Sequence, residues 1–354
     1  MLKMYNGSMK KTPFVLVFIA VFATTFFAIN KFAPVFFASS TNPNQTREIA
    51  PTKSETATAL TILSDATKNT DSSKEKLNPL SASSTNIAQK NTFDPIINIS
   101  PEKIIQGDPI MISVKNATVA EIQKIYFDGK SLWFFNYQKT PTAFYGFDIN
   151  QKPGQYVIEL KMEDGREIDK KIEIVERPKI EKPLGIPEKL GGNTPEAATA
   201  LVTNLSKENL LINNVWSVKK LFWQNKFQYP LANIVVTDPY GYSRDTVGYT
   251  ITHKGADFRA SVGTSVLAIN GGIVRLAKQF EIYGNTIAID HGFGIVSYYM
   301  HLSKLSVIEG QSVIRGQTIG LSGMTGYAES PHLHLSVKID GVSIDPIEFL
   351  NFFK

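Results

Sequence analysis

The sequence of 354 residues contains no cysteine and only five histidines. Without cysteine the chain cannot form a disulfide, carry a lipid on a thiol or hold a metal ion with thiolates. A zinc site would therefore have to use imidazole and carboxylate groups. The first 252 residues contain no histidine, and all five lie between His253 and His334. Histidine chemistry is confined to the C-terminal part of the chain.

A basic stripe is also missing. The net charge is +5, but residues 1–38 carry four lysines and no acidic residue, so most of the excess belongs to the N-terminus. A nucleic-acid-binding domain usually concentrates lysine and arginine on one face or along one element. We therefore expect no nucleic-acid partner, and the N-terminal lysines need another explanation.

The N-terminus has the pattern of an export segment. Lysines precede the uncharged, mostly apolar run 13–29, an order that keeps the N-terminus in the cytoplasm. The run is short for a spanning helix but long for a signal core, and no clean cleavage site follows it. We favour an uncleaved membrane anchor that comprises residues 1–38. A cleaved signal peptide is the second possibility. A buried helix of a soluble core is the third possibility, although the next segment offers nothing to bury it.

Composition indicates a linker and a β-domain after the anchor. Residues 39–96 are rich in Ser, Thr, Asn, Lys and Ala. They cannot bury enough surface to offset chain entropy, and we expect a disordered linker. Residues 97–177 alternate short apolar segments with turn dipeptides such as Asp-Gly and Pro-Gly, which predicts a small immunoglobulin-like β-sandwich. The sequence leaves open whether this module positions another domain, inhibits it or is a spacer.

The C-terminal half begins with a second linker. Residues 178–215 contain a predicted helix over 195–205, with Thr194 as the N-cap and Pro195 as the first helical residue. Residues 216–354 return to short strands with frequent glycine and almost no helical periodicity. The predicted fold class is mainly β, with two β-domains that follow an N-terminal membrane helix.

Four histidines occur in patterns that a metal site needs. In His332-Leu-His334, residues i and i+2 of a strand project from the same face, so the two imidazoles stand over one cavity. In His253-Lys-Gly-Ala-Asp257 a turn at the glycine brings both outer residues inward, and His301 follows a predicted strand. Each pattern alone is weak, because ion pairs are commoner. Together they use nearly every histidine of one β-domain and predict a metallohydrolase with an open coordination position.

The same motifs resemble those of the lysostaphin/LytM-type zinc endopeptidases. The resemblance is carried, in this order, by His253-Lys-Gly-Ala-Asp257, Ile289-Asp-His-Gly, Tyr298-Tyr-Met-His-Leu-Ser303 and Pro331-His-Leu-His334. It covers about residues 234–346, and this order of motifs is highly specific. An upstream Asp238-Pro-Tyr-Gly…Arg244 matches the family's Phe-Gly-x-Arg only loosely. The region 97–177 resembles, more loosely still, β-sandwich domains that precede this peptidase in bacterial envelope proteins.

The resemblance implies both a fold and a set of site residues. The fold is an antiparallel β-sheet that forms a groove, and the cofactor is one zinc ion per chain held by His253, Asp257 and His334. The catalytic imidazoles are His301 and His332, whose individual roles stay open. The fifth histidine, His291, lies in a tight turn between strands and is expected to be structural.

The sequence departs from the family beside this site. Glu329-Ser330 precede Pro331 where the family often has glycine, and Leu335-Ser336 follow the second histidine where the family often has Phe-Glu. No expected ligand or catalytic histidine changes. Loss of that glutamate is expected to weaken the hydrogen-bonded support of the zinc ligands.

These observations predict a zinc-dependent endopeptidase that hydrolyses peptide cross-links of bacterial peptidoglycan. We expect it in the cell envelope, outside the cytoplasm and anchored to the cytoplasmic membrane. The alternative is a non-catalytic LytM-like module that binds or activates another wall hydrolase, and a third possibility is a β-rich adhesin or wall-binding spacer. The domain order suggests that the 97–177 module or the helix at Pro195 covers the groove until a regulatory envelope protein or proteolysis releases it.

Overall fold

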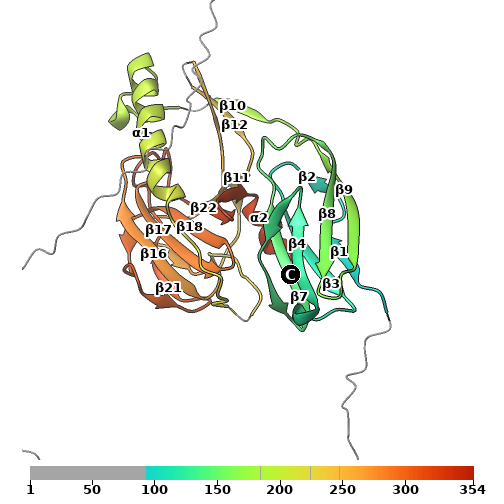
Figure 1. Cartoon of the computed structure of the whole chain (residues 1–354). Coiled ribbons are helices and arrows are strands. Elements are labelled where there is room, and N and C mark those ends of the chain that lie inside the picture. The colour runs from blue at the N-terminus through green and yellow to red at the C-terminus, as the bar shows by residue number, and fades with distance from the viewer. Residues whose placement is uncertain (1–92, 184, 224, 247) are drawn as a thin grey trace, which may run out of the picture. The chain divides into compact units, whose positions relative to one another are not determined.

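The computed structural model describes residues 93–354 except 184, 224 and 247. The predicted membrane anchor at 1–38 and nearly all of the predicted linker at 39–96 lie outside the described residues. Within the described ranges, no helix is long and apolar enough to cross a membrane. The described part of the chain is mainly β, which confirms the predicted class (Figure 1).

The first β-module consists of two sheets around one core. The first sheet is β1 (Ile96–Ser100), β3 (Pro109–Lys115), β7 (Thr140–Gly146) and β6 (Phe134–Tyr137). The second is β2 (Ile104–Ile105), β9 (Glu167–Val175), β8 (Gly154–Met162), β4 (Ile122–Phe127) and β5 (Lys130–Leu132). The 3-10 turn Val119–Glu121 precedes β4. Alternate residues Ile110, Ile112 and Val114 of β3 are buried with Ile158 and Leu160 of β8, because successive side chains of a strand point to opposite faces. The immunoglobulin-like class of this module stays a prediction.

The helix predicted at residue 195 is present and longer than expected. It follows β10 (Glu181–Pro183) and the 3-10 turn Glu188–Leu190, and α1 runs over Pro195–Asn213. The hydroxyl of Thr194 accepts a hydrogen bond from the backbone N–H of Ala197, as an N-cap does. The predicted end at residue 205 was too early, because the last two turns are held by tertiary contacts of Glu208 and Ile212 that local sequence does not reveal.

The C-terminal domain is built on one large antiparallel sheet (Figure 1). Its strands are, in spatial order, β11 (Val236–Asp238), β14 (Ala256–Arg259), β22 (His332–Ile339), β18 (Ile295–Leu302), β17 (Asn285–Gly292), β16 (Gly272–Gln279) and β20 (Ser312–Val313), with β23 (Val342–Ile344) also paired to β22. Smaller sheets are β15 (Ser265–Leu267), β21 (Thr318–Leu321) and β19 (Lys304–Leu305), and β10 with β12 (Ser243–Thr246) and β13 (Tyr249–Thr252). The chain ends with α2 (Pro346–Asn351).

The two faces of β22 differ in character. Leu333, Leu335, Val337 and Ile339 are buried in the main core of the domain. The alternate residues, His332, His334, Ser336 and Lys338, therefore point to the opposite face. We call this face of β22, together with Tyr298 and Met300 of the neighbouring β18, the groove floor. The hydrophobic pattern of one strand thus fixes which side of the sheet carries the polar chemistry.

Candidate metal centre and active site

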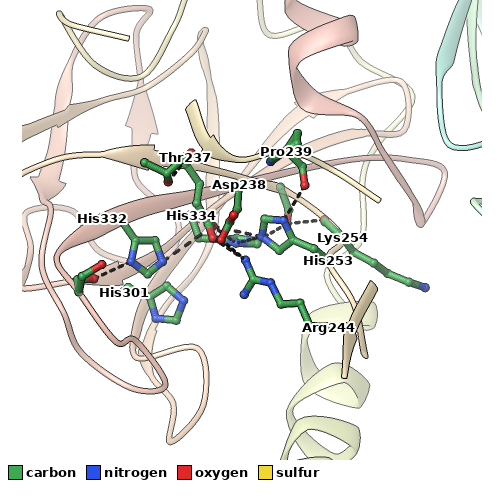
Figure 2. Close-up of polar contacts among 12 residues, drawn as sticks. Thr237, Asp238, Pro239, Arg244, His253, Lys254, His301, His332 and His334 are labelled. Carbon is green, nitrogen blue, oxygen red and sulfur yellow. Dashed lines mark hydrogen bonds and ion pairs between the residues drawn. The ribbon is translucent and has the colours of Figure 1, made fainter. Parts of the chain in front are cut away.

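Two neighbouring strands and one turn bring the three expected zinc ligands together. His334 of β22 lies directly opposite Asp257 of β14 in the antiparallel register. His253 lies just before β14, and its backbone N–H donates to the carbonyl oxygen of Tyr242, which fixes the turn. The three side chains are almost fully buried, and one ligand atom from each lies within 4.8 Å of the others (Figure 2). The sequence predicted this grouping.

The three ligand atoms form a tight triangle. His253 Nε2 lies 3.1 Å from Asp257 Oδ1 and 3.0 Å from His334 Nδ1. His334 Nδ1 lies 2.7 Å from the same Asp257 oxygen. Three polar atoms at these separations need either protons or a cation between them. The positions of the imidazole protons show which of the two the triangle requires.

Outer hydrogen bonds place the protons away from the triangle. His253 Nδ1 lies 2.9 Å from the carbonyl oxygen of Pro239, which can only accept, so in the neutral ring this nitrogen carries the proton and Nε2 has a lone pair. Ser336 Oγ donates to the carbonyl of Lys254 at 2.8 Å, so it accepts from His334 Nε2, also at 2.8 Å. His334 Nδ1 is therefore unprotonated as well.

The donor set consequently fits a cation. Two bare imidazole nitrogens and a carboxylate oxygen converge with no proton between them, which is unfavourable unless a positive ion lies among them. Burial lowers the pKa of His334 to about 4, which keeps this ring neutral and available as a ligand. Two histidines and one carboxylate are a donor set that catalytic zinc sites use, with a fourth position left open.

Two residues that the sequence did not assign to the site support the triangle. Arg244 Nη2 donates to Asp257 Oδ2 at 2.8 Å and to Asp238 Oδ2 at 3.0 Å, which leaves Asp257 Oδ1 to face the two imidazoles. At Gly255, an added Cβ would collide with the His334 ring and lie 2.6 Å from the carbonyl of Leu335. The motif Asp238…Arg244 and the glycine were visible in the sequence, but their contacts depend on long-range packing.

His301 reaches the site through an irregular backbone. Alternation along β18 would place it on the core side with Tyr299, but its φ of 60° is left-handed and breaks the alternation. The pairing of β18 with β17 shifts register at the same end of the strand, between Asn285 and Ile287. As a result His301 lines the same cavity as His334.

The two expected catalytic imidazoles lie side by side. The ring centroids of His301 and His332 are 4.8 Å apart, and His332 Nε2 lies 3.8 Å from Asp257 Oδ1 (Figure 2). Each donates its Nδ1 proton to a backbone carbonyl, of Thr325 at 2.9 Å and of Ser330 at 2.8 Å respectively. In the neutral form of each ring, Nε2 is therefore unprotonated. Burial and the neighbouring histidines lower the pKa of His301 to about 3, so this ring is neutral near pH 7.

Comparison with known proteins identifies the domain. Residues 251–346 match the model of "Peptidase family M23". The chain is 40% identical over 96 residues to the peptidoglycan DD-endopeptidase ShyA of Vibrio cholerae, a match that covers 27% of this chain and 22% of that protein. Residues 251–346 form a domain of peptidase family M23. This confirms the resemblance seen in the sequence.

Other relatives match a similar share of the chain. The DD-carboxypeptidase/endopeptidase Mpg of Neisseria meningitidis is 35% identical over 119 residues, which is 33% of this chain and 27% of Mpg. The crystallised catalytic domain of lysostaphin from Staphylococcus simulans is 34% identical, over 34% of this chain and 93% of that domain, with a TM-score of 0.32. The chain spans between a fifth and a third of the length of the curated relatives it matches.

One solved structure extends the likeness beyond the peptidase domain. A structure described as a putative M23 peptidase from Pseudomonas aeruginosa covers 70% of this chain and 95% of its own, with a TM-score of 0.53 and 23% identity. At this identity the likeness concerns the fold alone. The likeness in fold covers more of the chain than residues 251–346.

The fifth histidine of the M23 domain has a different environment. His291 is fully buried, with Nδ1 2.7 Å from the carbonyl of Gly271 and Nε2 2.8 Å from Ser297 Oγ. Its ring packs against Phe227 at 5.2 Å in the main core. Burial lowers the pKa of His291 to about 4. The structure thus places it apart from the triangle, in a setting where a neutral ring joins two segments.

Ser336 occupies the position where the family often has glutamate. Its hydroxyl supplies the hydrogen bond to His334 that we expected to be weakened by the loss of that glutamate. We predict that Ser336→Ala lowers zinc affinity about 10- to 100-fold, because His334 loses the partner that fixes its tautomer. The measurement is a competition titration against a chelator of known affinity. Ser297→Ala is the matched control, since it removes the same contact from His291 and should leave zinc affinity unchanged. An unaltered affinity in Ser336→Ala would show that the hydroxyl does not orient the ligand.

Helix α1 forms part of the lining of a cavity beside the site. The cavity measures about 590 Å³, and its lining includes His301 and His334 as well as Leu205 and Asn209 of α1. At one end of the helix Leu201 packs with Ile282 beside the cavity. At the other end, Ile212 packs on the Tyr298 side of the groove floor.

A buried glutamate attaches the helix to the wall of the cavity. Glu208 Oε1 accepts from the backbone N–H groups of Glu281 and Ile282 at 2.7 and 2.9 Å, and Oε2 accepts from Tyr283 at 3.0 Å. The Tyr283 hydroxyl also donates to Asn209 Oδ1 at 2.7 Å. Successive backbone N–H groups form an anion-binding concavity, and here the anion comes from the helix.

Proposed function

We propose that this chain is a zinc-dependent endopeptidase that hydrolyses peptide cross-links of bacterial peptidoglycan in the cell envelope. The observation that carries the proposal is the triangle of unprotonated ligand atoms from His253, Asp257 and His334, with two further histidines beside it. Relatives named as peptidoglycan DD-endopeptidases support the substrate class. Retention of all five residues argues against a purely non-catalytic module.

The chemistry divides between the metal and the two imidazoles. When bound to the triangle, zinc supplies Lewis-acid chemistry, because it polarises a carbonyl and lowers the pKa of water toward about 7. His301 and His332 each present a bare Nε2, so one of them accepts a proton from the attacking water. The same imidazole, once protonated, or its neighbour donates to the leaving amine. The buried ion pair of Arg244 with Asp257 holds the carboxylate in place during both steps.

The remaining parts of the chain fit an envelope enzyme. We assign residues 97–177 to an immunoglobulin-like module, 178–215 to a linker with a helix, and 216–354 to the peptidase domain.

Helix α1 keeps the enzyme latent in this proposal. Helix α1 lines the cavity in which His301 is buried, so it stands in the way of a cross-linked peptide that approaches this histidine. Movement of α1 is therefore a required step, and a regulatory envelope protein is the kind of partner that would drive it. The domain order offered two candidates for the segment that covers the groove, the helix and the 97–177 module. The helix contributes far more of the cavity lining than the module does.

The test is hydrolysis of intact peptidoglycan by the purified chain, with bound zinc measured in the same sample. We expect about one zinc ion per chain and release of soluble muropeptides, which a chelator stops and added zinc restores. Bound zinc without release of muropeptides would indicate the latent form. The variants of helix α1 distinguish a latent enzyme from an inactive one, because only a latent enzyme gains activity when the helix is loosened. Absence of zinc from the folded chain would refute the proposal.

A further inference from the structure

Lys338 lies on the groove floor beyond the metal centre. It is four residues after His334 on β22 and points to the same face, so the two Cα atoms are about 13 Å apart at the usual rise of a strand. Both side chains line the same cavity. An extended peptide that lies along this floor with its scissile bond at His334 would pass Lys338 three or four residues away.

Among the residues that the structure describes, the ammonium group of Lys338 has no anionic partner. The residue is 7% exposed, and its Nζ donates to the neutral amide oxygen of Asn213 at the end of α1. Nζ also lies 5.2 Å from the ring centroid of Tyr298. Among the described residues it forms no ion pair. A buried cation without an anion is unfavourable, so the protein retains a charge here that it does not neutralise itself.

The surroundings add to the positive potential. Three basic side chains other than histidine line the cavity, Arg244, Lys254 and Lys338, against one acidic side chain, Asp148. Arg244 is already paired with carboxylates of the metal centre. Burial and the charge of Lys254 lower the pKa of Lys338 to about 8, which leaves it largely protonated near pH 7. The unneutralised charge at this end of the cavity therefore belongs to the two lysines.

We propose that Lys338 binds a carboxylate of the substrate peptide and so determines which peptides this groove accepts. Lys254 is exposed at the rim of the cavity, and its charge adds to the positive potential at Lys338. While helix α1 lies on the groove, the amide oxygen of Asn213 occupies the position that the substrate carboxylate would take. The inference rests on the proposed peptidase function. If Lys338 merely anchored the end of the helix, an acidic partner on α1 would serve better than a neutral amide.

The experiment compares one cross-linked muropeptide with the same peptide after its free carboxylates are converted to amides. We expect the unmodified peptide to be preferred about 10- to 100-fold in kcat/KM, as for hydrogen bonds between charged groups. Lys338→Met keeps the apolar stem and should remove this preference mainly through KM, whereas Lys338→Arg should retain it. Lys304→Met, on the exposed strand β19, is the matched control. The kinetics are measured in the full chain and in Glu208→Gln, where α1 is expected to be released.

Asn213 provides a second, opposite test. Asn213→Asp places a carboxylate of the chain itself beside Lys338, so it should raise KM for the unmodified peptide and have no such effect in the Lys338→Met background. Equal kcat/KM for the two peptides in wild type would overturn the inference. So would a fall in kcat with unchanged KM in Lys338→Met, accompanied by a lower melting temperature, because that result indicates a structural anchor.

Binding separates this inference from the proposed function. In His332→Ala, calorimetry with the two peptides reports recognition without hydrolysis. If wild type binds zinc but cleaves neither peptide, while the carboxylate peptide binds in a manner that requires Lys338, the peptidase proposal fails and the carboxylate site stands. If cleavage occurs without discrimination between the peptides, the carboxylate site fails and the peptidase proposal stands.

Discussion

Replacing His334 by alanine is expected to remove both bound zinc and peptidoglycan hydrolysis. The substitution deletes one of three ligands and leaves Asp257 and His253 facing each other with no third donor. The metal contributes several kcal/mol of transition-state stabilisation, and a loss of about 4 kcal/mol corresponds to roughly a 10³-fold lower rate. The measurement combines metal analysis of the purified variant with the rate of muropeptide release.

His332→Ala is the matched control for the ligand assignment. It removes the adjacent imidazole on the same strand face but none of the triangle. We expect one zinc ion per chain to remain, while the rate falls about 10²- to 10⁴-fold, the usual contribution of a general acid or base. Retention of zinc by His334→Ala, or its loss from His332→Ala, would contradict the division into ligands and catalytic groups.

Holding α1 on the cavity is expected to abolish hydrolysis, and weakening its attachment should increase it. The chain contains no native cysteine, so Thr199→Cys and Tyr249→Cys can be joined selectively by a short reducible cross-linker. The native side chains approach to 3.3 Å between Thr199 on α1 and Tyr249 on the adjacent strand β13. We expect the cross-linked chain to keep its zinc, to lose activity, and to regain activity after reduction.

Glu208→Gln tests the same helix in the opposite direction. The neutral amide cannot accept from three backbone N–H groups, and a hydrogen bond to a charged group contributes about 1.5–3 kcal/mol, so the population of open molecules should rise at least about 10-fold. Hydrogen exchange at Ile282 and Tyr283 should increase with the rate of hydrolysis. Glu196→Gln, in the exposed first turn of α1, is the control. Full activity of the cross-linked chain would rule out a lid function.

The sequence was sufficient to predict the class of site because few residues in this chain can hold a metal. The chain has no cysteine, and every histidine lies between residues 253 and 334, so the composition alone leaves few candidate ligands. The period of two along His332-Leu-His334 then put both rings on one face. Thr194 and Pro195 likewise marked the start of α1 by local chemistry alone. These features depend on neighbours in the sequence, which is why they could be read there.

Support for the site came from contacts that no local pattern reveals. The glutamate that the family often has is replaced by Ser336, and weaker support was expected. However, Ser336 lies between His334 and the carbonyl of Lys254, 82 residues away in sequence from the serine, and fixes the tautomer of the ligand. The left-handed backbone of His301 was equally invisible, because no glycine marks it.

By itself, the sequence predicted the candidate ligand residues, and it determined the mainly β architecture and the face of β22 on which the polar residues lie. Tertiary structure alone decided which nitrogen of each histidine carries its proton, how Arg244 occupies the second oxygen of Asp257, and why α1 extends to Asn213 across the cavity. The reason is physical. Strand alternation and side-chain chemistry are local properties, whereas a tautomer, a buried ion pair and a helix end each depend on partners that folding brings from distant parts of the chain.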